Sequence, residues 1–395
     1  MSDSRIWAWL LIVLVLVSVL VCWSSVLDKA AVTRSLQHLA EQPIKSYITS
    51  VRGTTLLCTA ICILAVDFRA FPRRFCKAEK FGQGLMDIGV GAFIFSSGIS
   101  SRPAPLTRPY KGIVRSLERN GVLLILGLIR LGSVKTLEYQ EHASEYGVHW
   151  NFFLTVAAVS TVMALVPIPR SHSIEAGSVV LVGHQLALSC GLTDVIHADE
   201  RGPQLWHLNK EGLLSLPGYW ALSLLSVGLS SYLHPQYGRP DQKGAQVSDR
   251  DVWLWFRKLL AIIVLLWAAL SGALQWVQPV SRRACNMPYV LLSLALNWTL
   301  LMLFFTGSMI SSYCKPLLLL EACSRNMLLL FLLANVMTGT VNMTINSMLT
   351  STGHAMSIVC AYMFIICSVA CAMHSNKMYL NMTYKCVKST VKETA

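Results

Sequence analysis

The chain has 395 residues, of which 54% are hydrophobic and 13% are charged, and its formal net charge is +13. Soluble domains usually contain about 25% charged residues, so this composition indicates an integral membrane protein. The basic residues are dispersed over short loops, and no aromatic-rich basic domain is present to hold nucleic acid. Basic loops beside anionic lipid headgroups explain the excess charge better. We therefore expect the lipid bilayer, and no nucleic acid, as a partner.

A membrane-spanning helix needs about 20 mainly apolar residues, and about eleven segments of the chain meet this condition. These segments lack the alternation of barrel strands, and a backbone in lipid must satisfy its own hydrogen bonds, so we expect helices. The linkers leave no room for a separate soluble domain. We predict one all-α polytopic transmembrane bundle over residues 1–395, with spans at 6–27, 53–68, 84–101, 119–136, 148–168, 176–193, 213–233, 253–277, 287–310, 326–346 and 355–374.

The distribution of Lys and Arg predicts an orientation, because these residues favour cytoplasmic loops. The loops after odd-numbered spans, with the C-terminal tail, carry 21 of them, and the N-terminus with the even-numbered loops carries 11. This places the basic tail 375–395 in the cytoplasm. The polar segments after spans two, four, six, eight and ten then share the opposite face. The first span, 6–27, lacks a clear cleavage site after it, which favours a retained anchor over a secretory signal.

Several sequence motifs of well-known enzyme classes are absent from the chain. It contains no GxSxG elbow, no GxxxxGK[ST] loop and no GxGxxG motif. The twelve cysteines form no CxxC pair and lie mainly within spans, which predicts neither a disulfide framework nor a zinc site. We expect no metal and no bound cofactor. Any catalytic group must then come from residues at the membrane edge.

The most informative segment follows span two. Asp67 ends an apolar run, Pro72 breaks the helix just beyond it, and several cations come next. An ionisable side chain in or at a span is costly and usually marks a functional site. Burial raises the pKa of such an acid, and nearby cations lower it. We interpret Asp67 and Lys77 as functional, whereas Arg69 and Lys80 are more simply a charged helix end at the headgroups.

A second polar segment, Leu137 to Phe153, leads into span five. If it is helical, Glu138, His142, Glu145 and His149 share one face. Imidazoles and carboxylates so placed relay a proton, orient a hydroxyl or bind metal. The metal reading is the weakest, because HExxH is absent, and a wet interfacial helix without chemistry remains an alternative.

Other signals are weak individually. They are Asn209-Lys210-Glu211-Gly212 before span seven, Ser281-Arg282-Arg283 before span nine, and the amides Asn335 and Asn342 in span ten. Interhelical hydrogen bonding explains such amides equally well.

These segments resemble the GPI inositol acyltransferase (Gwt1/PIG-W) family. The resemblance rests on ILAVDF with FPRRF.K, LMDIGVGAFIFSSGISS, LEYQEHASEYGVHWNFF, NKEGLLSLPGY, VSRRACNMPY and NMLLLFLLANVMTGTVNM, and it covers about residues 47–345. Only one span precedes Tyr47, whereas family members have more. The resemblance implies transfer of a fatty acyl chain, typically palmitoyl, from acyl-CoA to the inositol 2-hydroxyl of glucosaminyl-phosphatidylinositol (GlcN-PI). It also implies the endoplasmic reticulum membrane as the location and acyl-CoA as a co-substrate. In that membrane the Lys and Arg distribution places the motif loops on the lumenal side.

Our mechanistic hypothesis is direct transfer in a cavity between spans two, three, five and ten. Asp67 is the expected base, and Lys77 holds it ionised or stabilises the oxyanion. His142 and His149, oriented by Glu141 and Glu145, are the alternative bases. Further substrate-binding candidates are Arg73, Arg74, Arg282 and Arg283 for phosphates, Asp87 for the glucosamine amine or a neighbouring cation, and Trp150, Asn151, Asn209, Asn335 and Asn342.

Three alternatives stay open. An acyl-enzyme on Cys76 would replace direct transfer. A polytopic lipid transporter or scramblase would replace the enzyme, although the chain shows no internal repeat of the kind transporters often have. The third is an inactive family member with a scaffolding role.

Overall fold

The computed structural model describes residues 43–100, 120–132, 145–233, 249–311 and 317–379, and every regular element in these ranges is helical. The longer helices are α3 (Pro43–Ala65), α4 (Ile88–Ser100), the helix Asn120–Gly132, α6 (Phe152–Leu165), α7 (Ser173–Ala187), α11 (Leu216–Leu233), α12 (Asp249–Trp276), α13 (Met287–Ser311), α15 (Met327–Thr344) and α16 (Thr352–Ser375). The short ones are η1 (Arg73–Phe75), η2 (Leu85–Asp87), η3 (Arg170–His172), η4 (Leu188–Leu192), α8 (Thr193–His197), α9 (Leu205–Leu208), α10 (Lys210–Leu214) and α14 (Leu318–Arg325).

The prediction of an all-α polytopic bundle is confirmed. Within the described residues, seven helices are long and apolar enough to cross a membrane, and three shorter apolar helices lie at Leu85–Ser100, Asn120–Gly132 and Phe152–Leu165. A helix of 13 residues is about 20 Å long, which is less than the ~30 Å hydrocarbon core. The number of eleven spans is therefore not confirmed. The predicted span 6–27 lies outside the described residues.

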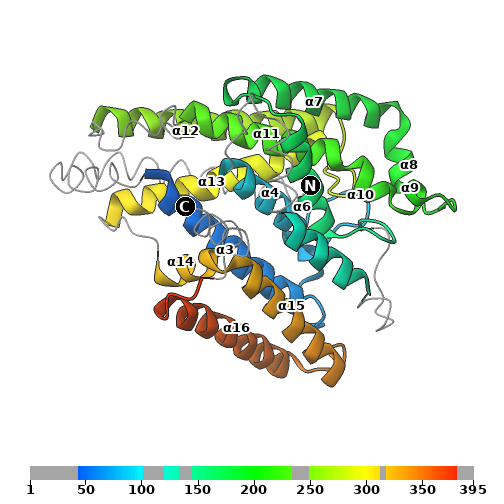
Figure 1. Ribbon diagram of the computed structural model, residues 1–395, viewed down its shortest axis with the longest axis vertical. Helices are drawn as coiled ribbons and strands as arrows, with labels where there is room; N and C mark the ends of the chain where they lie inside the picture. The colour runs from blue at the N-terminus through cyan, green and yellow to red at the C-terminus, as the bar shows by residue number, and fades with distance from the viewer. Residues whose placement is uncertain (1–42, 101–119, 133–144, 234–248, 312–316, 380–395) are drawn as a thin grey trace, which may run out of the picture.

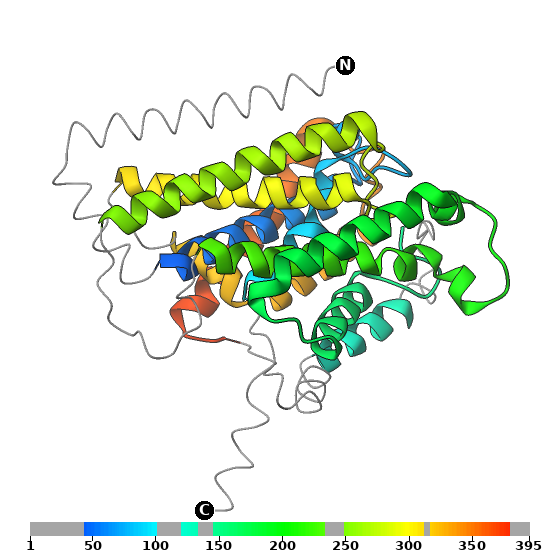
Figure 2. The same cartoon turned by 90° about the horizontal axis from the view of Figure 1, so that it is seen from above.

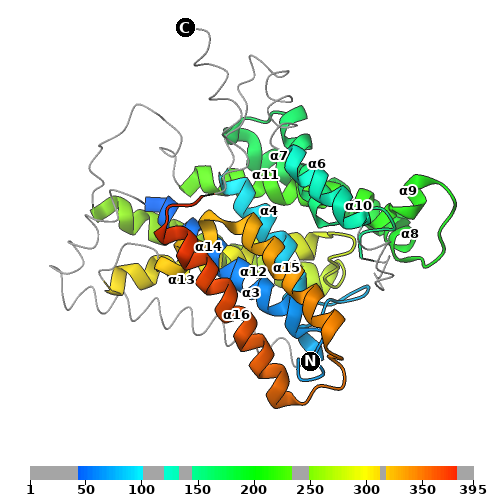
Figure 3. The ribbon, with the colours of Figure 1, turned by 60° about the horizontal axis from the view of Figure 1, so that its bottom comes forward.

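Helix α3 is the centre of the packing and runs through the middle of the bundle (Figure 1). Its first half, with Tyr47 and Val51, belongs to a core formed with α4, α6, α7, α11, α12 and α13. Its second half, with Leu56 and Leu64, belongs to another core formed with α6, α14, α15 and α16. Figure 3 shows α15 and α16 beside α3 on this second side. A single helix thus holds the two groups together.

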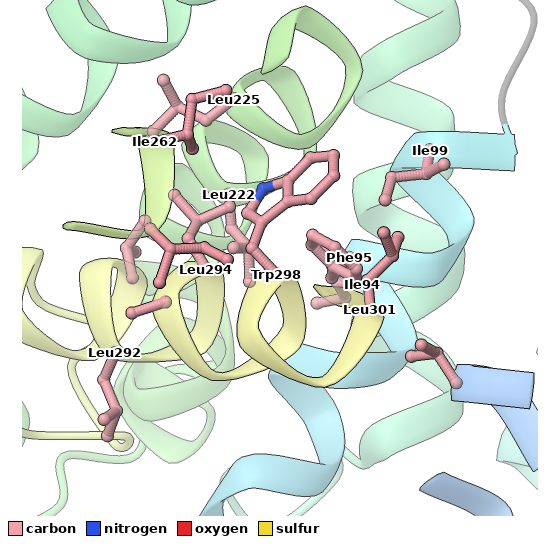
Figure 4. Close-up of a cluster of buried hydrophobic side chains, with 14 of the residues drawn as sticks. Ile94, Phe95, Ile99, Leu222, Leu225, Ile262, Leu292, Leu294, Trp298 and Leu301 are labelled. Atoms are coloured by element: carbon pink, nitrogen blue, oxygen red, sulfur yellow. The ribbon is translucent and has the colours of Figure 1, made fainter. Parts of the chain in front are cut away.

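The first core is built from interlocking aromatic and aliphatic side chains. Trp298 of α13 meets Phe95 of α4 edge to face, with ring centroids 5.3 Å apart, and Leu222 of α11 lies in the same cluster (Figure 4). Helices α12 and α13 run side by side, as do α7 and α11 (Figure 2). Edge-to-face aromatic pairs contribute about 0.5–1.5 kcal/mol beyond their buried area. Helices α4, α12 and α13 of this core form one wall of the cavity described next.

The second core has a polar connection in its centre. The Tyr362 hydroxyl of α16 is buried and lies 3.0 Å from the Ala60 carbonyl of α3 and 3.3 Å from the Ala334 carbonyl of α15. A buried hydroxyl in an apolar surrounding needs such a partner. Tyr362 therefore fixes how α16 seats against α3 and α15.

Candidate functional site

A cavity of about 2100 Å³ lies in the bundle. Its lining comes from α3, α4, α6 and α15, the helices of predicted spans two, three, five and ten. The helix Asn120–Gly132, α12 and α13, which the prediction did not include, line it as well. Apolar residues such as Phe93, Ile263 and Leu300 form much of its wall. Charged residues line it as well: Asp67, Arg73, Lys77, Glu79, Lys80, Arg130, Glu145, Asp199, Arg282 and Arg283.

The polar segments expected on one face do converge. Lys77, after span two, pairs with Glu145, before span five. Arg282, after span eight, pairs with Asp87 at the start of span three and lies 3.5 Å from Glu145. Glu211, in the connection after span six, pairs with Arg283, the neighbour of Arg282. Asn342, at the end of span ten, donates to Asp67, which follows span two. The compartment that this face meets stays a prediction.

Asp67 lies just beyond the end of α3, where the chain leaves the helix in a turn and the Asp67 amide donates to the Leu64 carbonyl. The Asn342 side-chain Nδ2 donates to Asp67 Oδ2 at 2.7 Å. Burial raises the pKa of Asp67 above its ordinary value, and this outweighs the hydrogen bond from Asn342 and the charges of Arg73 and Lys77. A carboxylate with a raised pKa is a better proton acceptor than an ordinary one.

Lys77 is held by Glu145 rather than by Asp67. Lys77 Nζ lies 2.8 Å from both carboxylate oxygens of Glu145. Burial alone would raise the pKa of Glu145, but the charges of Arg282 and Lys77 hold it below its ordinary value. Lys77 and Asp67 line the same cavity, and Lys77 acts on Asp67 through its charge. The expected direct partnership of these two residues is thus replaced by Lys77–Glu145 and Asp67–Asn342 pairs.

Asp87 is fully buried and organises the loop before it. Its Oδ2 accepts from the Ala78 and Gly84 amides at 3.0 and 2.8 Å, and its Oδ1 accepts from Arg282 Nε at 2.8 Å. The Arg282 guanidinium also lies over the Tyr146 ring, 5.4 Å from its centroid. Of the two predicted roles, Asp87 therefore fixes a neighbouring cation. It does not line the cavity, so the glucosamine amine has no access to it there.

A second buried cluster joins two segments that the sequence analysis named only as weak, separate signals. The Glu211 carboxylate is fully buried and receives Arg283 at 2.8 Å and Arg201 at 2.6 Å. Its neighbour Lys210, also buried, donates to the Ala198 and Glu200 carbonyls. The signal was the charged pair Lys210-Glu211 at the entry to an apolar span, which reads as an ordinary helix-entry loop when taken alone.

The described part of the segment before α6, residues 145–151, does not form the predicted helix. Residues 145–150 form turns, and Gly147 has φ +120°, which a helix does not allow. A Cβ at Gly147 would lie 2.6 Å from Cα of Asn209, so the two segments touch here. Glu145 lines the cavity and His149 does not, so the shared helical face is wrong for these two. Glu138, Glu141 and His142 lie outside the described residues.

The other candidates of this segment hold backbone in place. Asn209 Oδ1 accepts from the His149 amide at 2.7 Å. Asn151 caps α6 by accepting from the Leu154 amide and donates to the Gly127 carbonyl. Trp150 donates to Thr155 at 2.9 Å. The structure gives Trp150, Asn151 and Asn209 no place in the cavity lining.

The remaining candidates divide in the same way. Arg73, Cys76 and Asn335 line the cavity, although the Asn335 amide donates to the Phe331 carbonyl of its own helix. Arg74 is exposed outside the lining, with its guanidinium over the Phe75 ring. Arg282 and Arg283 line the cavity but are buried and paired with carboxylates.

Comparison with known sequences adds the family. A sequence model of the GWT1 family matches residues 1–373. The chain belongs to the GWT1 family. It is 37% identical to an uncharacterized protein of Arabidopsis thaliana, over 91% of this chain and 80% of that protein. It is 36% identical to GPI-anchored wall transfer protein 1 of Aspergillus fumigatus (84% of this chain, 72% of the relative) and 34% identical to the protein of that name from Saccharomyces cerevisiae (86% and 75%). The GWT1 match includes every residue that lines the cavity.

Proposed function

We propose that this chain is a membrane-bound O-acyltransferase of GPI-anchor biosynthesis. It moves a fatty acyl chain, palmitoyl in the first instance, from acyl-CoA to the inositol 2-hydroxyl of GlcN-PI. Membership of the GWT1 family and the GPI-related names of its fungal relatives support the pathway. The observation that carries the chemistry is Asp67, a carboxylate of raised pKa facing a large and mainly apolar cavity that is also lined by cations.

The reaction needs a base for the hydroxyl. The inositol oxygen attacks the thioester carbonyl carbon while its proton passes to Asp67. The tetrahedral intermediate then collapses, the C–S bond breaks, and the proton returns from Asp67 to the thiolate of CoA. The Asp67 carboxylate is ionised at the start and at the end of this cycle, and its desolvation favours acceptance of the proton in between.

The negative charge that develops on the carbonyl oxygen needs a cation or donor. Lys77 lines the same cavity and its side chain is 40% exposed, so a substrate can reach it while Glu145 holds its ammonium in place. Arg73, which is exposed and donates to the Val66 carbonyl, suits a phosphate of either substrate. Arg282 and Arg283 serve the site by holding Glu145, Asp87 and Glu211.

The test is acylation of GlcN-PI by purified enzyme with labelled palmitoyl-CoA. Asp67→Asn keeps the shape but removes the base, and we expect a loss of about 10²- to 10⁴-fold in kcat. Lys77→Ala should also lose most of its activity. Asp194→Asn, an exposed carboxylate outside the cavity, is the matched control and should retain normal activity. Near-normal acylation by well-folded Asp67→Asn would overturn the assignment.

Two results would replace the proposal with a rival. Loss of all turnover in Cys76→Ala, together with a labelled protein thioester, would mean an acyl-enzyme rather than direct transfer. Lipid movement in proteoliposomes without acylated product would mean a transporter or scramblase.

A further inference from the structure

In the side-chain amide of Asn342, the nitrogen has a hydrogen-bond partner and the oxygen has none. Its Nδ2 donates to Asp67 Oδ2 at 2.7 Å, whereas its Oδ1 is buried without a hydrogen-bond partner. The residue lies in the last turn of α15 and lines the cavity. Buried polar atoms in proteins nearly always have a partner, and an orphaned acceptor loses about 1–3 kcal/mol of solvation. Because Asn342 lines the cavity, a molecule bound there can supply the missing partner once the side chain turns this oxygen toward it.

Chemistry fixes which way the amide points. An ionised carboxylate only accepts hydrogen bonds, so Asp67 demands the NH₂ end of the amide. Oδ1 then has to face away from Asp67. The amide oxygen and nitrogen are bonded to the same carbon atom, and the nitrogen contacts Asp67. The oxygen therefore also lies close to the proposed base. Asp67 and Asn342 both line the cavity, so their two Oδ1 atoms are neighbouring acceptors at its wall.

We propose, on the basis of the function given above, that Asn342 and Asp67 together grip two adjacent hydroxyls of the inositol ring. Asp67 takes the proton of the reacting 2-hydroxyl. Asn342 Oδ1 accepts a hydrogen bond from the 3-hydroxyl, which is the free hydroxyl beside it because C1 carries the phosphodiester. Asn342 is in this sense a substrate-positioning residue that also orients the base. The grip selects the acceptor position on a ring that carries several similar hydroxyls.

The decisive experiment pairs an enzyme variant with a substrate analogue. Wild-type enzyme and Asn342→Leu are each measured with GlcN-PI and with a GlcN-PI analogue that lacks the inositol 3-hydroxyl. A lost neutral hydrogen bond corresponds to about three- to tenfold in kcat/KM. We expect wild type to lose this factor on the analogue and Asn342→Leu to show no further loss, since its acceptor is already absent. Equal wild-type activity on both substrates would overturn the proposal, even if Asn342→Leu failed to fold.

The pH profile supplies a second readout that a structural role would not move. Besides Asn342, the groups that act on the Asp67 carboxyl are Arg73 and Lys77, which remain in the variant. Removing the donor that favours the ionised form should shift the acidic limb of kcat/KM in Asn342→Leu to higher pH. An unchanged limb would contradict the proposal. Thr344→Val, two residues on, exposed and outside the cavity, is the control and should match wild type.

The two proposals fail differently. If wild-type enzyme acylates no GlcN-PI at all, the proposed function is wrong. If wild type is active and Asp67→Asn is not, but wild type does not distinguish the analogue, only the adjacent-hydroxyl grip is wrong.

Discussion

Asp67 experiences opposing influences on its charge. The apolar end of α3 and the cavity wall disfavour its ionised form, whereas Asn342, Arg73 and Lys77 favour it. The net effect is a raised pKa, because desolvation is the largest of these effects. A catalytic base works best when its pKa approaches the working pH but still leaves it ionised. The burial of Asp67 moves its pKa in this direction.

The raised pKa predicts the acidic limb of the activity profile. The base acts when ionised, so kcat/KM should fall as the pH drops through the pKa of Asp67. Since that pKa is raised, the fall should begin above about pH 4, where an ordinary aspartate titrates. Glu145 titrates below its ordinary range and so does not account for this limb. A wild-type profile, measured with recovery of activity on return to neutral pH, checks this. Full activity down to pH 4 would contradict it.

The loop between α3 and α4 depends on one glycine. Gly84 donates its amide to Asp87 and crosses the chain at Cys76, where an added Cβ would lie 1.8 Å from the Cys76 carbonyl oxygen. No side chain fits at that distance. Lys77 follows Cys76 directly, so the crossing also places the ammonium that faces the cavity.

Gly84→Ala should therefore open this crossing and displace Lys77. We expect at least a tenfold fall in acylation rate, measured at equal amounts of folded protein. Gly183→Ala in α7 is the matched control, since a Cβ there meets nothing within 4 Å, and it should be neutral or slightly stabilising. Wild-type activity in Gly84→Ala would show that the crossing does not position the lysine.

At the scale of elements, the sequence predicted helices better than their ends. Span two was expected at 53–68, but α3 runs over Pro43–Ala65. The helix begins at Pro43, a residue that suits a first helical turn. The prediction missed this start because an apolar window leaves out the polar residues Lys45 and Ser46. The kink in the helical stretch Arg170–His197, where Gly191 has φ +109°, has no signature in hydrophobicity. The turn at Gly147 was likewise hidden, because it depends on contact with a distant segment.

At the scale of the molecule, the charges form links between distant segments. Glu211 with Arg283 ties the connection before α11 to the loop after α12, and Arg282 with Asp87 ties that loop to α4. The sequence predicted that these segments share a face, from alternation of the spans. It did not predict the partners, because each pair joins residues 72 and 195 positions apart and depends on tertiary packing.

Glu211→Gln should loosen this assembly. Removing the charge leaves the buried Arg283 guanidinium without this carboxylate, which typically costs about 3–5 kcal/mol. Glu321→Gln is the matched control, because its pair with Arg325 is partly exposed and such pairs contribute about 1 kcal/mol or less. Thermal inactivation of detergent-solubilised enzyme should show a clearly larger fall in midpoint for Glu211→Gln. Equal midpoints for the two variants would mean that the link is dispensable.

The depth of the cavity gives a prediction for the acyl donor. Along α3, α12 and α13 the lining residues farthest from the polar loops are Thr54, Leu260 and Leu303. Thr54 is 13 residues from Asp67, or about 20 Å along the helix. This exceeds the ~15 Å occupied by one leaflet of hydrocarbon, so a full-length membrane acyl chain fits between the base and this end.

Leu303→Trp should therefore shorten the space for the acyl chain. In a panel of acyl-CoA lengths, we expect the ratio of kcat/KM for palmitoyl-CoA to that for lauroyl-CoA to fall at least about tenfold, because chain ends that no longer fit lose their burial. Leu265→Trp on α12 is the control: Leu265 is 68% exposed on the outer side of its helix and should leave the ratio unchanged. If both variants keep the wild-type preference, the acyl chain does not extend to Leu303, and the donor lies along α15 instead, where the lining reaches Phe331.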